Sequence, residues 1–182
     1  MASWKPLPKY VTGASWTWDT PIHWIDTSEM DFKEEFVGET SGALIRRKRT
    51  CSYQELKIYI NRIGGSRILE EKIDFGIISP YKAQVQYLRN KIKADASLKP
   101  YRSLFTVNTV DGFQGQERDV IFISLVRANE EGQIGFLNDL RRMNVAITRA
   151  RMKLVILGEA ETLKHHGFYR KLLEFIQNIG NQ

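Results

Sequence analysis

The fold is decided by the stretch Phe75-Gly76-Ile77-Ile78-Ser79-Pro80-Tyr81-Lys82-Ala83-Gln84, in which an apolar run leads into a polar turn. A short apolar run bounded by turn residues is typical of a strand that is buried on both faces of a parallel sheet. Residues 81–92, which follow, place their apolar side chains at helical spacing. Ser79 suits a helix cap, and Pro80 suits the first turn of a helix. The stretch therefore predicts a strand, a turn and a helix in succession.

The same alternation continues on both sides of this stretch. Further strands are predicted at residues 22–25, 104–110, 120–126 and 154–157, and further helices at residues 53–63, 140–150 and 168–179. Strands that alternate with helices predict an α/β domain of three layers, with a mainly parallel sheet between helices. Residues 1–20 show neither period, so we expect either an irregular lead-in or the tail of an element that this sequence does not include, and the domain over residues 21–182.

Composition limits the classes of protein. The chain has 182 residues, of which 42% are hydrophobic and 26% charged, so it is expected to form one folded domain rather than a disordered chain. No apolar run is long enough for a membrane helix, Met1 to Pro6 do not begin a signal peptide, and the single cysteine, Cys51, cannot form an internal disulfide. We therefore expect a soluble, cytoplasmic protein with no membrane partner and no metal site.

The chain is basic. Its net charge is +6 and its isoelectric point is near 9.4, which is compatible with a polyanionic partner such as nucleic acid. Many intracellular domains are mildly basic without any such partner, so charge alone does not decide between these interpretations.

Ligands of such sheets bind beyond the carboxyl ends of the strands, which directs attention to the segments that follow the strands. In residues 109–119, Gly112 and Gly115 let backbone amides approach a phosphate, and Gln114 and Glu117 add hydrogen-bonding groups. The alternative is a simple turn between two strands. A turn requires fewer glycines and fewer polar side chains, so the pattern favours a ligand site.

Residues 140–151 are rich in arginine. On a helix, Arg142 and Arg149 lie seven residues apart and share one face, while Met143 and Ile147 seat the helix against the sheet. Arginine stays charged and offers a planar donor fork, which suits the charge that develops on a phosphoryl group during transfer. The alternative is an arginine face in solvent that binds nothing.

Four motifs carry a resemblance to a known family. They are Ser79-Pro-Tyr-Lys-Ala-Gln84, Val110-Asp-Gly-Phe-Gln-Gly-Gln-Glu117, Arg127-Ala-Asn129 and Arg141-Arg-Met-Asn-Val-Ala-Ile-Thr-Arg-Ala-Arg151. Over about residues 21–160, their order, spacing and identity resemble motifs IV, V, Va and VI of the second RecA-like domain of superfamily 1 helicases. The most similar branch contains the RNA helicase of nonsense-mediated decay and its bacterial DNA-helicase relatives. The resemblance implies a RecA-like fold and a part in ATP-dependent movement on single-stranded DNA or RNA.

The resemblance also implies roles for individual residues. Arg149 stands where the family has its arginine finger, and Gly115 and Glu117 match residues near the nucleotide. Arg142 matches an arginine that braces either motif V or the nucleotide, and we group it with Arg149 as catalytic. The positions that match the contacts to the bound strand are Ser79, Pro80, Tyr81, Thr109, Gln114, Arg127 and Asn129.

The chain lacks part of an ATPase. It contains no G-x-x-x-x-G-K-[ST] pattern, so the resemblance implies that a first RecA-like domain of the same protein holds most of the ATP and Mg²⁺. We expect this fragment to hydrolyse no ATP alone. Two alternatives stay open: a non-enzymatic nucleic-acid-binding or adaptor module of the same fold, and an α/β domain that binds a small phosphorylated ligand by itself. Only the helicase interpretation requires a Walker A domain upstream, and only the last predicts nucleotide affinity for the isolated chain.

One window departs from the family. Where the family shows Asn-x-x-Glu-Ala, residues 43–53 read Ala-Leu-Ile-Arg-Arg-Lys-Arg-Thr-Cys-Ser-Tyr, which indicates a basic loop in solvent or a nucleic-acid patch. A third hypothesis is a local shift of the reading frame over residues 44–53. Some codon choices there, read in a shifted frame, spell Asn-Lys-Lys-Glu-Ala-Asp-Leu-Leu-Leu and restore the signature. The gene sequence tests this hypothesis, and we assign no role to Arg46 and Arg47.

Overall fold

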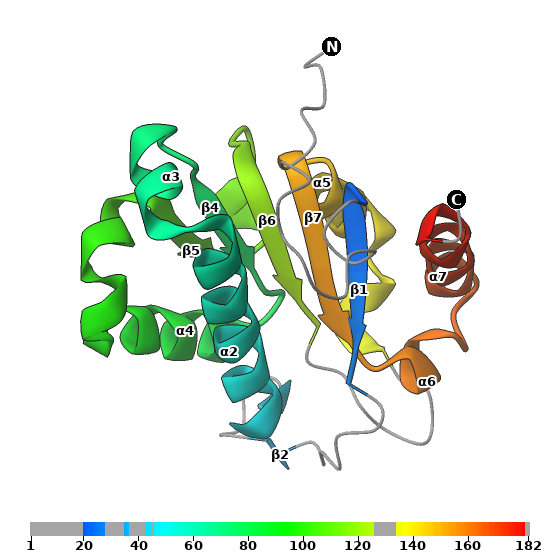
Figure 1. Ribbon diagram of the computed structural model, residues 1–182. Helices are drawn as coiled ribbons and strands as arrows, with labels where there is room; N and C mark the ends of the chain where they lie inside the picture. The colour runs from blue at the N-terminus through cyan, green and yellow to red at the C-terminus, as the bar shows by residue number, and fades with distance from the viewer. Residues whose placement is uncertain (1–19, 28–34, 37–42, 45, 126–133, 181–182) are drawn as a thin grey trace.

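The computed structural model describes residues 20–27, 35–36, 43–44, 46–125 and 134–180. Its centre is a five-stranded sheet in which each pair of neighbouring strands is parallel (Figure 1). In spatial order the strands are β1 (Ile22–Asp26), β7 (Ala150–Gly158), β6 (Arg118–Ser124), β4 (Phe75–Ile78) and β5 (Phe105–Asn108). A separate antiparallel pair consists of β2 (Glu35–Phe36) and β3 (Ala43–Leu44). The strands predicted from the sequence are therefore confirmed.

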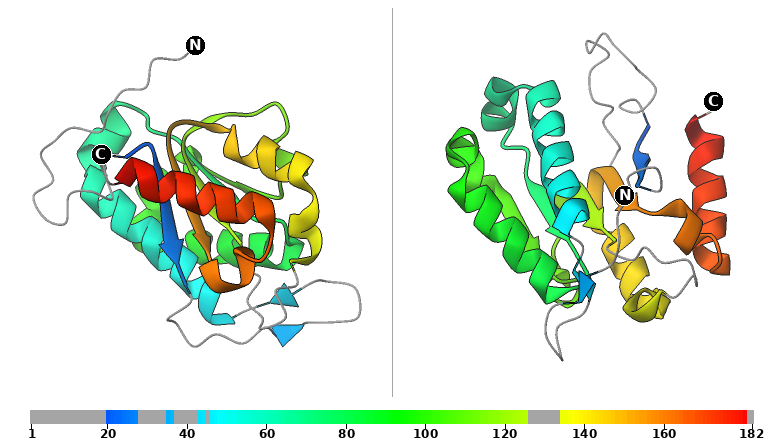
Figure 2. Two further views of the ribbon diagram at one scale, coloured as in Figure 1. Left: turned by 90° about the vertical axis from the view of Figure 1, so that its right-hand side faces the viewer. Right: turned by 90° about the horizontal axis from the view of Figure 1, so that it is seen from below.

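Helices cover both faces of the sheet, which gives the three layers of a RecA-like domain (Figure 2). One face packs against α2 (Arg46–Ile63), α3 (Gly65–Glu70), α4 (Lys82–Ala94) and the 3₁₀ helix η1 (Ala96–Leu104). The other packs against α5 (Leu140–Ile147), α6 (Ala160–Leu163), α7 (Gly167–Gly180) and the short 3₁₀ helices η2 (Asp111–Phe113) and η3 (Gly135–Asn138). None of the helices in the described part of the chain is both long and apolar enough to cross a bilayer.

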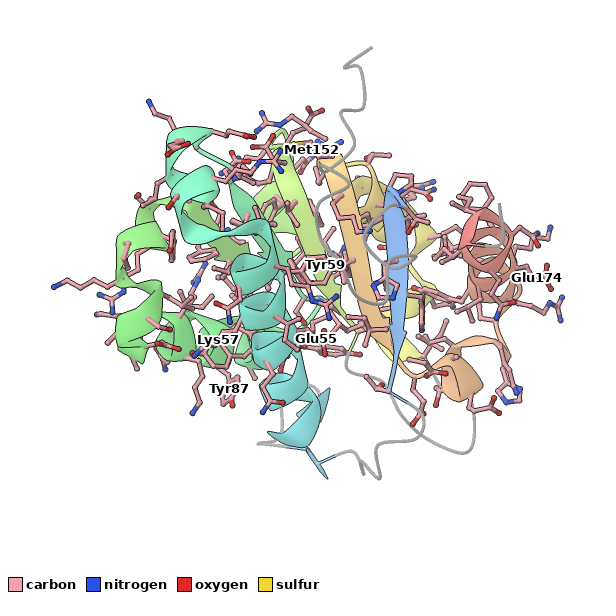
Figure 3. The ribbon with its side chains drawn as sticks, viewed as in Figure 1. Glu55, Lys57, Tyr59, Tyr87, Met152 and Glu174 are labelled. Carbon is pink, nitrogen blue, oxygen red and sulfur yellow. The ribbon has the colours of Figure 1, made fainter. Side chains whose placement is uncertain are left out.

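The two faces have separate hydrophobic cores, because successive side chains of a strand point to opposite faces. In β6, Val120 and Phe122 belong to the core under α2 and α4, whereas Ile121 and Ile123 belong to the core under α5. The ring of Tyr59, labelled in Figure 3, meets Phe122 edge-on at 5.0 Å between centroids. Burial on both faces explains why the strands read as apolar runs in the sequence.

Because the five strands run in the same direction, the sheet has an amino edge, where its strands begin, and a carboxyl edge, where they end. The arrowheads of Figure 1 point downward, so the amino edge is uppermost, and Met152 marks it near the upper end of β7 in Figure 3. Each connection between parallel strands returns the chain from the carboxyl edge to the amino edge. Residues 109–117 make this return between β5 and β6, and α5 makes it before β7.

One predicted helix end is wrong in a way that affects the site. The helix predicted over residues 140–150 ends at Ile147, and β7 begins at Ala150, where it pairs with Arg118 of β6. Arg142 and Arg149 therefore do not share a helix face. Arg142 lies in the first turn of α5, and Arg149 lies in the turn that follows it.

One predicted helix cap and one predicted helix start are also wrong. The N-cap of α4 is Tyr81, so Pro80 precedes the helix, and the hydroxyl of Ser79 accepts a hydrogen bond from the Tyr81 amide at 3.4 Å. The helix expected over residues 53–63 begins at Arg46. The basic window is thus helical from residue 46 onward rather than a loop, and the frame-shift hypothesis stays a prediction.

Candidate functional site

The carboxyl edge brings together three of the predicted residues, Pro80, Thr109 and Arg142, around a pocket of about 30 Å³. The ends of β4 and β5 lie side by side, with Ile78 opposite Asn108. The Ser79 amide donates to the Asn108 carbonyl at 3.3 Å, and the Thr109 amide donates to Asn108 Oδ1 at 2.9 Å. Sheet pairing and these local hydrogen bonds therefore place the two predicted turns next to each other.

Arg142 contacts two carboxylates at this edge. Its Nε lies 3.3 Å from Asp111 Oδ1 and 3.4 Å from Asp139 Oδ2. Asp139 is the N-cap of α5, and its side chain accepts a hydrogen bond from the Arg142 amide. The side chain of Arg142 is 48% exposed, so each pair contributes at most about 1 kcal/mol. Together the two pairs hold the guanidinium of Arg142 against η2, in the segment that resembles motif V.

The turn of residues 79–81, called the motif IV turn after the motif that it resembles, has mostly interior side chains. Ser79 and Tyr81 are buried, whereas Pro80 is partly exposed. Below the turn, the buried Gln84 donates from Nε2 to Ser124 Oγ at 3.1 Å, and Ser124 pairs with Ser52 of α2 at 2.8 Å. These two hydrogen bonds join α4, which follows the turn, to β6 and α2. Three more residues were predicted to contact the bound nucleic-acid strand. Gln114 is exposed, while Arg127 and Asn129 lie outside the described residues.

The amino edge holds three further predicted residues, Gly115, Glu117 and Arg149. The Arg118 amide donates to the Arg149 carbonyl at 2.9 Å, so the end of the 109–117 segment lies beside the turn after α5. Glu117 is exposed. Gly115 has φ +75° and open space where a Cβ would stand, so its conformation rather than crowding calls for glycine.

The guanidinium of Arg149 folds back on its own helix. Its Nε donates to the Val145 carbonyl at 3.0 Å, and its Nη2 donates to Thr148 Oγ1 at 3.1 Å. The last carbonyls of a helix lack partners within the helix and carry partial negative charge, which favours a cation there. In this structure Arg149 therefore supplies a cation to the carboxyl end of α5.

The prediction that all these segments lie at the carboxyl edge is wrong for Gly115, Glu117 and Arg149. Glu117 and Arg149 directly precede strands, Gly115 lies two residues before Glu117, and the start of a parallel strand lies at the amino edge. The carboxyl-edge rule applies only to the residues that directly follow a strand, such as Pro80 and Thr109.

Sequence reasoning missed a charged cluster at the amino edge, formed by Asp74, Asp119 and Arg151. Arg151 contacts both carboxylates, at 2.9 Å and 3.0 Å. Burial alone would lower the pKa of the Arg151 guanidinium, but Asp119 and Asp74 outweigh it and raise that pKa above its usual value. A signal was present, because each of the three lies at or beside the start of an apolar strand run.

The described residues contain no group of three or more His, Cys, Asp or Glu side chains that could hold a metal ion. Apart from the paired cluster of Asp74, Asp119 and Arg151, the amino edge offers the exposed carboxylate of Glu117 as an acceptor, the guanidinium of Arg149 as a donor, and the open turn at Gly115. This set fits the outer parts of a nucleotide, its hydroxyl groups and terminal phosphate, and it does not fit a complete phosphate cradle.

Known helicases resemble the chain over most of its length. Residues 8–161 match a family described as an AAA domain. The chain is 38% identical over 147 residues to the DNA polymerase alpha-associated DNA helicase A of Saccharomyces cerevisiae, an overlap of 81% of this chain and 20% of that protein. It is 41% identical over 113 residues to an uncharacterized ATP-dependent helicase of Methanocaldococcus jannaschii, or 62% of this chain and 16% of the relative. It is 45% identical over 102 residues to a regulator of nonsense transcripts 1 homolog of Neurospora crassa, which is 55% of this chain and 9% of that protein.

The chain thus spans a fifth or less of the length of each of these relatives. The matched region fits the C-terminal half of a helicase motor, and the predicted resemblance is confirmed. The chain belongs to the AAA_12 family, the AAA domain of superfamily 1 helicases.

Proposed function

We propose that this chain is the second RecA-like half of an ATP-dependent motor that moves on single-stranded DNA or RNA. The observation that carries the proposal is the division of the predicted residues between two edges. Pro80 and Thr109, which match positions that contact the bound nucleic-acid strand, lie at the carboxyl edge. Glu117 and Arg149, which match positions near the nucleotide, lie at the amino edge. A motor must link two such surfaces, and both α5 and residues 109–117 run from one edge to the other.

On the nucleotide side, a first RecA-like domain of the same protein holds most of the ATP and Mg²⁺, and ATP supplies the free energy of hydrolysis. Arg149 is the arginine finger: it exchanges its hydrogen bonds to Val145 and Thr148 for the terminal phosphate and stabilises charge that develops during transfer. Glu117 accepts hydrogen bonds from nucleotide hydroxyl groups, and Gly115 maintains the turn beside it. The isolated chain hydrolyses no ATP.

On the nucleic-acid side, Pro80 and Thr109 face the bound strand from the carboxyl edge. Gln114 contacts that strand from the exposed part of the 109–117 segment, and Arg127 and Asn129 complete the contact. Ser79 and Tyr81, which are buried, shape the motif IV turn instead of reaching the strand themselves. Arg142 braces η2 through Asp111. Phosphate contacts release counterions, so we expect weak binding by this half of the track, with an affinity that falls steeply as salt increases.

The test is Arg149→Ala in the protein that contains both RecA-like domains. Turnover stimulated by single strands should fall by about 10³ to 10⁵, because a finger of this type acts chiefly in the transition state, while strand affinity and folding stay near normal. Arg67→Gln is the matched control, since Arg67 pairs with Glu71 at 2.7 Å on the surface of α3. Near-normal turnover of Arg149→Ala would contradict the motor and favour the adaptor.

A further inference from the structure

The Arg151 cluster, defined as Asp74, Asp119 and Arg151, ties the starts of β4, β6 and β7 together. Asp74 and Asp119 exchange hydrogen bonds: the Asp74 amide donates to Asp119 Oδ2 at 3.1 Å, and the Asp119 amide donates to Asp74 Oδ1 at 2.6 Å. Each carboxylate therefore satisfies the backbone donor of the other residue. The arrangement fixes the register of β4 against β6 but brings two negative charges together.

Arg151 compensates these two charges. Its Nε donates to Asp119 Oδ1 at 3.0 Å, and its Nη2 donates to Asp74 Oδ1 at 2.9 Å. The planar fork of one guanidinium thereby reaches carboxylates on two other strands. The two carboxylates are 26% and 19% exposed, so removing the guanidinium leaves two partly buried negative charges close together. Arg118 stays nearby, but its Nε lies 3.8 Å from Asp74 Oδ2, farther than either contact of Arg151.

The cluster also lies at a bulge. Arg118 pairs with Ala150, and the next pair after the irregularity is Val120 with Lys153, so β7 contributes one residue more than β6 between these pairs. A bulge interrupts the ladder and changes the direction of a side chain. Arg151 and Met152 form this irregular part of β7, and the contacts of Arg151 with Asp119 span it.

The bulge connects directly to Arg149. The Arg149 carbonyl accepts from the Arg118 amide at 2.9 Å, Arg118 precedes Asp119, and Asp119 contacts Arg151. Because Ala150 joins Arg149 to Arg151 along the chain, backbone and side-chain bonds thus form a closed loop through these five residues. The loop fixes the backbone of Arg149, while the guanidinium of Arg149 keeps its separate hydrogen bonds to α5.

We infer that Arg151 is a positioning residue for the proposed arginine finger: through Asp74 and Asp119 it holds the start of β7, and thereby sets where the Arg149 guanidinium can reach. The inference rests on the proposed function. An ordinary surface ion pair contributes at most about 1 kcal/mol to stability and would have no specific effect on turnover. Position matters more, because a displacement of about 1 Å at a reacting group costs about 10²-fold in rate.

The experiment uses Arg151→Gln, Arg149→Ala and the double variant in the two-domain protein, with single-strand-stimulated ATP hydrolysis as the readout. Arg151→Gln should lower kcat by about 10- to 100-fold and change KM for ATP by less than about threefold. In the Arg149→Ala background, Arg151→Gln should change kcat by less than about twofold, because a residue that acts through another has no effect once that residue is gone.

Asp74→Asn is a second, milder variant, which serves if Arg151→Gln fails to fold. The amide oxygen can still accept both bonds of Asp74 Oδ1 while the charge is lost, so kcat should fall by about three- to tenfold, again only when Arg149 is present. Arg67→Gln should leave kcat unchanged.

The outcomes separate the two proposals. If Arg149→Ala loses turnover while Arg151→Gln and Asp74→Asn keep it, or if their losses multiply with that of Arg149→Ala, the positioning role is wrong and the finger stands. If Arg149→Ala keeps its turnover, the proposed function fails and the positioning role fails with it.

Discussion

The amino and carboxyl edges of the sheet differ in how their charges are held. At the amino edge, Arg151 donates to partly buried carboxylates that also accept backbone amides, so the strands begin in a fixed arrangement. At the carboxyl edge, Arg142 meets the exposed carboxylates of Asp111 and Asp139 at 3.3 Å and 3.4 Å, beside a small pocket. A fixed edge suits a group that must meet one phosphate, and an adjustable edge suits a surface that binds a moving strand.

Phe113 joins the two edges, and its truncation should have the largest effect on stability. Phe113 lies in the middle of the 109–117 segment and is fully buried. The Cζ atom of the Arg118 guanidinium lies over its ring, 5.9 Å from the ring centroid. Phe113→Ala should lower the free energy of unfolding by about 3–5 kcal/mol, measured by urea denaturation. Phe175→Ala on α7 is the matched control, since Phe175 is 57% exposed and its loss should cost about 0.5 kcal/mol or less. Similar values for the two variants would mean that Phe113 does not anchor the return.

The strands and the layers could be predicted from the sequence, because burial on both faces leaves apolar runs that need no tertiary information. The end of α5 could not be predicted in this way. The helical period of Met143 and Ile147 continues to Ala150, but Ala150 pairs with Arg118, which belongs to a different part of the chain. A tertiary contact therefore overrides the local pattern.

The motifs name the candidate residues one by one, and the roles of these residues stay predictions, whereas their division between two edges required the direction of each β-strand. That direction follows from the parallel sheet, since Glu117 and Arg149 stand directly before strands. The Arg151 cluster is a different case. Its hydrogen bonds join residues 32 and 77 positions apart, and no local pattern specifies which carboxylates Arg151 will meet.

Two glycines of the 109–117 segment, Gly112 and Gly115, are required for different physical reasons. A Cβ on Gly112 would stand 2.2 Å from the side-chain amide of Asn108, whose Oδ1 already accepts a hydrogen bond from the Thr109 backbone amide. At Gly115 the space for a Cβ is open, but the backbone has φ +75°. Gly112→Ala should therefore cost about 1–3 kcal/mol of stability by crowding. Gly115→Asn should cost less than about 1 kcal/mol, because asparagine tolerates the left-handed region. Thermal or urea unfolding compares the two, and adding Asn108→Ala should recover part of the Gly112→Ala loss. Equal costs with no recovery would contradict this distinction.

The pH dependence of stability should arise between the edges, at His23 of β1. Burial, followed by the nearby Lys153 charge, lowers the pKa of His23 from 6.5 to about 4, and its Nδ1 lies 3.1 Å from the Tyr59 hydroxyl. The unfolded chain then binds more protons than the folded chain at intermediate pH. The contribution of neutral His23 to the free energy of unfolding is complete above pH 6.5 and is lost as the pH falls toward 4. Unfolding free energy should be about 1–2 kcal/mol lower at pH 5 than at pH 7, and His23→Gln should remove that difference. An unchanged pH dependence in His23→Gln would assign it to another group.

Arg142→Ala should have the smallest effect and separates the edges most directly. Removing the guanidinium leaves Asp111 and Asp139 uncompensated beside Thr109, so phosphates of a bound strand meet negative charge where η2 was braced. Single-strand affinity of the two-domain protein should fall by about three- to tenfold at low salt, and by less at moderate salt, where the charges are screened. Arg141→Ala, the loss of one charge from the same helix, is the control and should change affinity by about twofold or less. Fluorescence anisotropy with a labelled oligonucleotide measures both, and KM for ATP should stay unchanged. A raised KM for ATP with unaltered single-strand affinity in Arg142→Ala would instead assign Arg142 to nucleotide binding. The two edges would then no longer have separate ligands.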